Sequence, residues 1–190
     1  MNPQRRIALF GGTFDPVHEG HMRVARLARQ QAHLDEVIFI PCQQSPHKKQ
    51  SSSACIDDRL AMLRLATTEP WMRVSDYEAR TPGPSFSYLT VEHFIAEHPQ
   101  TEWFWLMGCD QWNALPRWKH PEILARHLTF LVFSRGEIPQ PREGYRMIHL
   151  QGTHPASATA LRDPGGGHFL DPQWLHPAVR THILNKQLYQ

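Results

Sequence analysis

The sequence predicts an α/β fold in which a doubly wound, mostly parallel sheet is flanked by helices. Short apolar segments rich in β-branched and aromatic residues alternate with segments whose apolar residues recur every three or four positions. This alternation favours a parallel sheet, with ligands bound beyond the carboxyl ends of its strands. The chain has 190 residues, of which 41% are hydrophobic, so we expect a single domain over 1–190 with a small helical part at about 157–190.

The first half of the chain contains three predicted strands and two predicted helices. Each strand is a short apolar run that ends at Gly, Pro or polar residues, and each helix presents an apolar face. In order, the elements are a strand at 7–10, a helix from 20 to about 32, a strand at 36–40 that stops at Pro41, a helix at 57–68 and a strand at 72–75.

The second half continues this alternation with a predicted helix and three strands. We expect the helix to be capped from Ser85 or Ser87, because small hydroxyl side chains satisfy the free N–H groups of a first turn. In order, the elements are a helix at 87–98 and strands at 103–107, 127–133 and 146–150.

Charge and cysteine content narrow the classes of function. Lys and Arg number 20 against 18 Asp and Glu, so there is no broad positive field for a nucleic acid polymer, and any affinity for phosphate must be local. The three cysteines are scattered, which argues against a disulfide framework and for a reducing compartment. No run of 18 apolar residues predicts a membrane span, and the N-terminus lacks the apolar length of a signal peptide. We therefore expect a cytoplasmic protein that does not bind membranes.

The most informative segment runs from Gly11 to His21 and reads GGTFDPVHEGH. Glycines after a strand let the backbone approach a ligand closely, and the N-terminus of the following helix favours negative charge. His18 and His21 are three residues apart, so both imidazoles can lie on one side of the first helical turn. There they could donate hydrogen bonds to phosphoryl oxygens and gain protons as negative charge arrives. Taken separately, a Gly-Gly pair also fits a tight turn, and His-x-x-His also fits a metal pair or two unrelated surface groups.

Taken whole, this segment resembles the signature of the His-x-Gly-His nucleotidyltransferase superfamily, in the version found in bacterial nicotinate mononucleotide adenylyltransferases. The resemblance extends over essentially the whole chain and implies a Rossmann-like fold. It also implies an activity: ATP donates an adenylyl group to nicotinate mononucleotide, giving deamido-NAD and pyrophosphate in NAD biosynthesis.

The resemblance implies where ATP binds. The segment from Ala156 to Arg162 is similar to the family's Ile-Ser-Ser-Thr-x-Ile-Arg motif, with Ala at two positions that Ile and Ser usually fill. Its hydroxyls and its arginine would hold the β and γ phosphates, although a Ser/Thr helix start is also common without any ligand. The implied contacts to ATP and its phosphates are Gly11, Gly12, Thr13, Phe14, His18, His21, Arg135, Ser157, Thr159 and Arg162, with His18 and His21 catalytic.

The implied contacts to nicotinate mononucleotide are Lys48, Ser87, Asp110, Trp118 and Lys119. Lys48 ends a Pro-His-Lys segment whose basic residue contacts phosphate in the family. Asp110 ends a Gly-x-Asp segment whose carboxylate is similar to the ribose hydroxyl acceptors of other nucleotide sites, and it also fits a helix N-cap.

The pyridine end of the implied site departs from the family pattern. Trp118 offers an aromatic plane to the pyridine ring, whereas Trp112 fits core packing. Ser87 stands where the family has Thr and keeps a hydroxyl for the nicotinate carboxylate, while Phe86 replaces a Tyr. Lys119 stands where the family often has Tyr; its backbone amide can hold the carboxylate, and its ammonium favours an acid over an amide.

The implied mechanism needs no nucleophilic side chain, because the phosphate monoester of the acceptor itself attacks the α-phosphorus of ATP. Positioning and charge neutralisation then do most of the chemistry. Mg²⁺ is expected to travel with ATP and pyrophosphate, without a protein metal site, and Asp15 is expected to shape its loop. The histidines that gain no role and are expected to be surface groups are His154, His168, His176 and His182.

Two other functions stay open at this stage. The same chemistry could use another acceptor, nicotinamide mononucleotide or phosphopantetheine. The departures at Phe86, Ser87, Lys119 and Ala156 also leave room for a non-catalytic nucleotide-binding module. The expected partners are ATP and nicotinate mononucleotide, and the protein could be a monomer or a homodimer.

Overall fold

The computed structural model describes residues 4–44 and 53–190, which form a six-stranded sheet with the order β3-β2-β1-β4-β5-β6. All five strand pairings in it are parallel. The strands are β1 (Arg5–Gly12), β2 (Glu36–Pro41), β3 (Met72–Val74), β4 (Thr101–Gly108), β5 (Leu128–Ser134) and β6 (Arg146–Gln151). The chain builds one half of the sheet outward from β1 to β3, then returns and builds the other half from β4 to β6. The doubly wound, Rossmann-like prediction is therefore confirmed, and the point where strand order reverses lies between β1 and β4.

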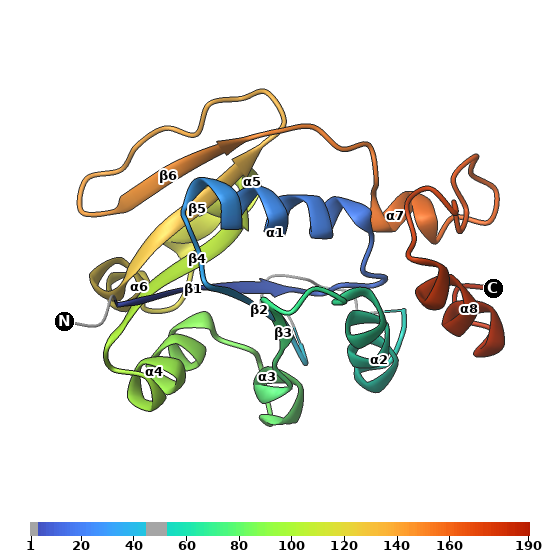
Figure 1. Cartoon of the computed structure of the whole chain (residues 1–190), viewed down its shortest axis with the longest axis horizontal. Helices are drawn as coiled ribbons and strands as arrows, with labels where there is room; N and C mark the ends of the chain where they lie inside the picture. The colour runs from blue at the N-terminus through green and yellow to red at the C-terminus, as the bar shows by residue number, and fades with distance from the viewer. Residues whose placement is uncertain (1–3, 45–52) are drawn as a thin grey trace.

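Helices cover both faces of this sheet, and Figure 1 shows α1 crossing in front of the strands while α5 lies behind them. Alternate side chains of β1 explain this arrangement: Ala8 and Phe10 join one buried cluster, and Ile7 and Leu9 join the other. The helical segments are α1 (Glu19–Gln31), α2 (Ile56–Ala66), α3 (Tyr77–Arg80), α4 (Ser87–Glu97), α5 (Cys109–Ala114), the 3₁₀ turn η1 (Leu115–Arg117), α6 (Pro121–His127), α7 (Ala158–Leu161) and α8 (Pro177–Asn185). Among the described residues, no helix is long and apolar enough to cross a membrane.

The predicted elements recur within a few residues of their expected positions, with informative differences. β1 continues through both glycines, because Gly11 and Gly12 pair with Ile40 and Pro41 of β2. The helices α3, α5 and α6 and the turn η1 have no counterpart in the prediction, because three to seven residues are too few to show a helical repeat.

The expected cap of α4 is wrong. Phe86 occupies the N-cap position without a side-chain hydrogen bond, and Ser87 is the first helical residue. Ser85 Oγ instead accepts a hydrogen bond of 3.0 Å from the backbone N–H of Gln43, which ties the start of α4 to the loop after β2. The Ser87 hydroxyl is therefore not used as a cap.

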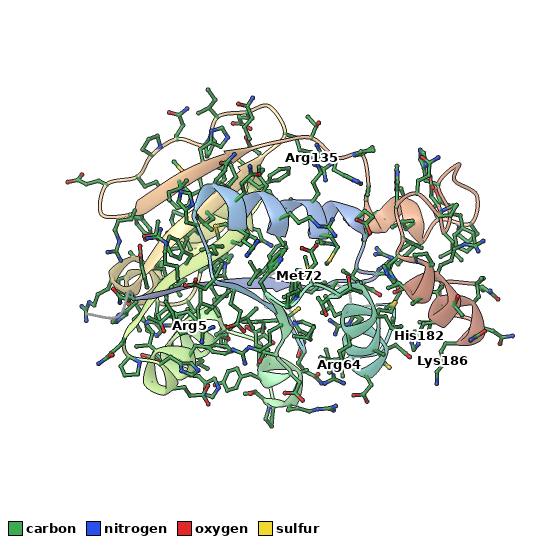
Figure 2. The ribbon with its side chains drawn as sticks, in the orientation of Figure 1. Arg5, Arg64, Met72, Arg135, His182 and Lys186 are labelled. Carbon is green, nitrogen blue, oxygen red and sulfur yellow. The ribbon has the colours of Figure 1, made fainter. Side chains whose placement is uncertain are left out.

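The C-terminal helical part packs against the first half of the chain. In Figure 1, α8 lies beside α2 at the end of the molecule opposite the N-terminus. Figure 2 shows His182 on the side of α8 toward α2, where its Nε2 lies 3.0 Å from Asp58 Oδ1. His182 is thus not a plain surface group as expected, and neither is His176, whose Nδ1 accepts a 3.3 Å hydrogen bond from the N–H of Ala178 at the start of α8.

Candidate active site

A cleft of about 1840 Å³ opens at the carboxyl ends of β1, β4 and β5, where strand order reverses. Lys48 lies outside the described residues. The other predicted site residues all line this cleft: Gly11, Gly12, Thr13, Phe14, His18, His21, Ser87, Asp110, Trp118, Lys119, Arg135, Ser157, Thr159 and Arg162. Residues from 11 to 162 therefore meet in one place, as the proposed site requires.

The loop after β1 is held in a defined shape. Phe14 has a φ of 51°, in the left-handed region, and the Asp15–Pro16 peptide is cis. Asp15 is buried, and its carboxylate accepts hydrogen bonds from the N–H of Ser53 at 2.7 Å, the N–H of Ala54 at 3.1 Å and the hydroxyl of Tyr189 at 2.7 Å. Asp15 therefore shapes the loop, as predicted.

Two arginines donate hydrogen bonds to backbone carbonyls of this loop. Arg59 on α2 is 2% exposed, and its guanidinium donates to the carbonyls of Thr13 at 2.8 Å and Cys42 at 2.9 Å. Arg162 donates to the carbonyl of Asp15. Arg59 was not identified from the sequence, because an Arg inside an otherwise amphipathic helix looks like an exposed residue until the fold places it under the loop.

His18 and His21 lie together at the N-terminus of α1, with ring centroids 3.8 Å apart. The backbone N–H of His18 donates a 3.2 Å hydrogen bond to Nδ1 of His21, which leaves the His21 ring proton on Nε2. Burial, and after it the charges of the neighbouring His154 and Arg135, lower the pKa of His18 to about 3. His18 is therefore neutral in the free protein at pH 7, and only an anion close by would favour its protonated form.

His154 belongs to this cluster, contrary to the expectation that it is a surface group. It lines the cleft and is partly buried, and its Nδ1 accepts a 3.0 Å hydrogen bond from the N–H of Ala156. Arg135 follows β5 and is exposed; Figure 2 labels it above α1. The imidazoles of His18, His21 and His154 and the guanidinium of Arg135 therefore line the same cleft. Such a set of groups is suited to negatively charged ligands.

The segment before α7 presents hydroxyl groups to the same cleft. Ser157 is the N-cap residue of α7, but its side chain makes no capping hydrogen bond. Thr159 is exposed within the first turn, and Arg162 is the C-cap residue. Ser157 therefore does begin a helix, which was the alternative to a role in phosphate binding. Its hydroxyl is not used for capping and is available to a ligand.

Aromatic side chains form the opposite end of the cleft. Trp118 meets Trp105 edge to face, with centroids 6.2 Å apart and an angle of 81° between the rings. A Cβ at Gly11 would lie 3.0 Å from the Trp105 ring, so the absence of a side chain there lets the strand approach this indole. Trp112, by contrast, is fully buried and donates from Nε1 to the carbonyl of Gln140 at 2.9 Å, which confirms its assignment to the core.

Two departures from the family pattern contact each other at this end. The Lys119 ammonium lies 4.6 Å from the centre of the Phe86 ring and 5.9 Å from that of Tyr88. Within residues 4–44 and 53–190, Lys119 forms no ion pair with a carboxylate. Its charge is therefore placed on aromatic faces at the cleft wall and is not neutralised there.

Two carboxylates complete the cleft wall. Glu78 is 5% exposed and accepts a 2.6 Å hydrogen bond from Thr90 Oγ1, and burial raises its pKa. Asp110 is exposed in the first turn of α5, whose N-cap is Gly108, so the N-cap alternative for Asp110 is wrong. Its carboxylate does not cap α5 and is exposed in the cleft, where a ligand can contact it.

The family comparison agrees with this geometry. Residues 9–163 match the cytidylyltransferase-like family, so the chain belongs to this family of nucleotidyltransferases. A "Probable nicotinate-nucleotide adenylyltransferase" of Synechococcus sp. (strain JA-3-3Ab) is 42% identical over 201 residues, covering 98% of this chain and 95% of the relative. One of the same name from Neisseria meningitidis serogroup C (strain 053442) is 39% identical over 201 residues, covering 98% and 99%. Within the class, the chain is therefore a member of the nicotinate-nucleotide adenylyltransferases.

Solved structures show the same fold at low sequence identity. The nicotinic acid mononucleotide adenylyltransferase of Plasmodium falciparum, complexed with NaAD, aligns with a TM-score of 0.79 over 98% of both chains at 16% identity. A structure described as a "Putative Nicotinate-nucleotide Adenylyltransferase" from Vibrio parahaemolyticus aligns with a TM-score of 0.66 at 18% identity, over 98% of this chain and 96% of that one.

Proposed function

We propose that this protein transfers the adenylyl group of ATP to nicotinate mononucleotide, forming deamido-NAD and pyrophosphate. The proposal rests on one observation: a single cleft, at the point where strand order reverses, is lined by the Gly11–His21 segment, the Ser157–Arg162 segment and the Trp118 ring. We call the Gly11–His21 segment the Gly11–His21 cradle. Relatives that align over nearly their full length bear the name of this activity. The cleft thus has an anion-binding end and an aromatic end, which correspond to the two substrates.

The chemistry is an in-line displacement at phosphorus. An oxygen of the acceptor's phosphate forms a bond to the α-phosphorus of ATP, and the bond from that phosphorus to the bridging oxygen of pyrophosphate breaks. Both nucleophile and leaving group are already charged, so the protein contributes by aligning them and by stabilising the charge that builds up on the α-phosphoryl oxygens.

The residues with proposed roles at the phosphates divide into three groups. The backbone from Gly11 to Phe14 approaches the phosphates, while His18 and His21 donate hydrogen bonds to the α-phosphoryl oxygens in the transition state. Arg135, Ser157, Thr159 and Arg162 hold the β and γ phosphates.

The acceptor occupies the other end. Trp118 stacks on the pyridine ring, and Ser87 and Lys119 bind the nicotinate carboxylate, Ser87 through its hydroxyl and Lys119 through its backbone amide and its ammonium. Asp110 accepts hydrogen bonds from a ribose. Lys48 contacts the acceptor's phosphate in this proposal, which rests for that residue on the sequence.

Mg²⁺ enters with ATP in this proposal. Among residues 4–44 and 53–190, no three or more His, Cys, Asp or Glu side chains are grouped to hold a metal ion. Mg²⁺ is commonly held by substrate phosphates and water, so the ion would reach the cleft on the phosphates of ATP. The ion would neutralise phosphate charge. None of the three cysteines forms a disulfide in the structure, and this supports a reducing location such as the cytoplasm.

A side-by-side assay tests the proposal. Purified protein is incubated with Mg²⁺ and ATP and, in separate reactions, nicotinate mononucleotide, nicotinamide mononucleotide or phosphopantetheine, and pyrophosphate release is measured. We expect the highest kcat/KM with nicotinate mononucleotide. A higher value with either other acceptor would replace the proposed substrate, and no release with any acceptor would favour a non-catalytic nucleotide-binding module.

A further inference from the structure

The His154 side chain lies where the phosphate-binding elements converge. It is in the segment between β6 and α7, three residues before Ser157, and it lines the cleft with His18 and Arg135. A Cβ at Gly20, in the first turn of α1, would lie 2.9 Å from the His18 ring and 3.4 Å from Nδ1 of His154. The missing side chain at Gly20 therefore leaves room for both imidazoles against the start of α1.

The hydrogen bond from Ala156 sets the protonation of the His154 ring. Because Nδ1 accepts the 3.0 Å bond from the N–H of Ala156, the ring proton lies on Nε2, which is then a donor. Nε2 makes no hydrogen bond to the residues that the structure describes. A donor on a partly buried ring in the cleft is thus available to a ligand with acceptor oxygens.

The charges around His154 favour an anion. Burial lowers the pKa of His154, and the guanidinium groups of Arg23 and Arg135 lower it as well, while Glu19 acts in the opposite direction. The lowered pKa keeps the ring neutral at pH 7 in the free protein, and the two nearby guanidinium groups add further donors for a phosphate group.

We propose that His154 is a third imidazole of the triphosphate site, which donates its Nε2–H to an oxygen of the β or γ phosphate of ATP, the part that leaves as pyrophosphate. The identity of the phosphate rests on the proposed function, whereas the anion contact rests on the position of the ring. His18 and His21 stabilise the α-phosphoryl group, and His154 holds the leaving group near Ser157 and Thr159.

The chain provides a matched control for this proposal. The sequence His-Pro-Ala occurs at 154–156 and again at 176–178, and in both copies the histidine Nδ1 accepts the N–H of the alanine two residues later. His176 caps α8 and does not line the cleft. Asn in place of either histidine can accept the same N–H in an Asx turn, but its amide does not reach the position of Nε2.

The experiment compares wild type, His154→Asn, His154→Ala and His176→Asn. Isothermal titration calorimetry measures binding of inorganic tripolyphosphate, steady-state kinetics measures KM for ATP, and thermal unfolding verifies that each variant is folded. We expect His154→Asn to weaken tripolyphosphate binding and raise KM for ATP by about 10-fold, the effect of losing one hydrogen bond to a charged group, with His176→Asn close to wild type.

The outcomes separate the two proposals. Wild-type affinity for tripolyphosphate in His154→Asn would overturn the role of His154, and a loss in His154→Ala that Asn restores would assign the ring to loop structure alone. If wild type binds tripolyphosphate through His154 but transfers no adenylyl group to nicotinate mononucleotide, the proposed function fails while the anion contact of His154 stands.

Discussion

The His18 ring combines burial with a position at the start of α1, and this combination defines its chemistry. It is 8% exposed, and its pKa of about 3 leaves it uncharged across the range in which enzymes are assayed. The sequence suggested imidazoles that gain protons as phosphate arrives; in the free protein, burial and the nearby Arg135 and His154 oppose that charge. His18 therefore begins as a neutral ring, and its proposed role is to donate a hydrogen bond to the negative charge that develops in the transition state.

Removing this donor tests its role. We expect His18→Ala to lower kcat for adenylyl transfer by on the order of 10²-fold, the effect of removing one transition-state hydrogen-bond donor, with a smaller change in KM for ATP. Because the pKa lies near 3 in the free protein, the ratio of wild-type to variant kcat/KM for ATP should stay constant between pH 6 and 9, with no step near the ordinary histidine value of 6.5. A kcat near that of wild type would remove His18 from the mechanism.

Lys119 and Phe86 make a separate contribution at the pyridine end. The ammonium lies 4.6 Å from the Phe86 ring centre, so two departures from the family pattern form one contact. Ser87 provides a hydroxyl nearby, and the structure shows that α4 does not use it as a cap. The expected preference for nicotinate over nicotinamide thus depends on the positive charge of Lys119. The Tyr that often stands at this position in the family would not supply that charge.

Substitution of this lysine should alter acceptor choice. We expect Lys119→Met to lower kcat/KM for nicotinate mononucleotide by about 10-fold, because a charged partner of the carboxylate is lost, and to leave kcat/KM for nicotinamide mononucleotide nearly unchanged. Arg117→Met is the control, since Arg117 is an exposed cation in η1 that does not line the cleft. Equal losses with both acceptors would show that the ammonium does not read the carboxylate.

The contact between α2 and α8 links the C-terminal part to the cleft. Asp58 accepts a 3.1 Å hydrogen bond from the Cys55 thiol and lies 3.0 Å from Nε2 of His182. Cys55 is the N-cap residue of α2 and also lines the cleft. The same helix carries Arg59, which donates a hydrogen bond to the loop after β1. The packing of α8 on α2 therefore helps to hold this loop in place.

Neutralising Asp58 should loosen this docking. The pKa of Asp58 is lowered, first by the hydrogen bond from Cys55 and then by His182, so its stabilising effect is present above the ordinary value of 3.8 and is lost as pH falls through the folded pKa. We expect Asp58→Asn to reduce the free energy of unfolding by about 0.5–1 kcal/mol at pH 7 and by nearly nothing once the pH has fallen below the folded pKa of Asp58. Urea denaturation at several pH values measures this; Asp57→Asn, whose partner Arg80 is exposed, should have a smaller effect. An Asp58→Asn effect that persists at low pH would exclude the charge as its cause.

Across the whole molecule, the order of strands decides where the site forms. β1 and β4 are neighbours although about 90 residues separate them, and their carboxyl ends carry Gly12 and Gly108 on opposite sides of the switch point. Helices on both faces leave the strand ends open, so the loops that follow the strands line the cleft. Parallel topology thus converts distant motifs into neighbouring ones.

The single-domain prediction has a direct test. Two observations support the single-domain prediction. Helix α8 packs on α2, and one buried cluster includes Leu161 and Val179 together with residues of β1 and β2. We expect one cooperative thermal transition in calorimetry, with equal calorimetric and van't Hoff enthalpies, because a shared core cannot unfold in parts. Two resolved transitions would show that residues at about 157–190 form a separate unit.

The sequence by itself determined the fold class, the family, the helix and strand periodicity and fourteen of the residues that line the cleft, because these depend on local side-chain patterns and on motifs that are continuous in the chain. It did not place α3, α5 and α6, which are too short to show a repeat. Only the tertiary structure decided that His18 is neutral, that Arg59 lies under the Gly11–His21 cradle, that Lys119 meets Phe86 and that His154 joins the imidazoles. Each of these depends on burial or on contact between segments far apart in sequence, and such properties arise only when the sheet brings those segments together.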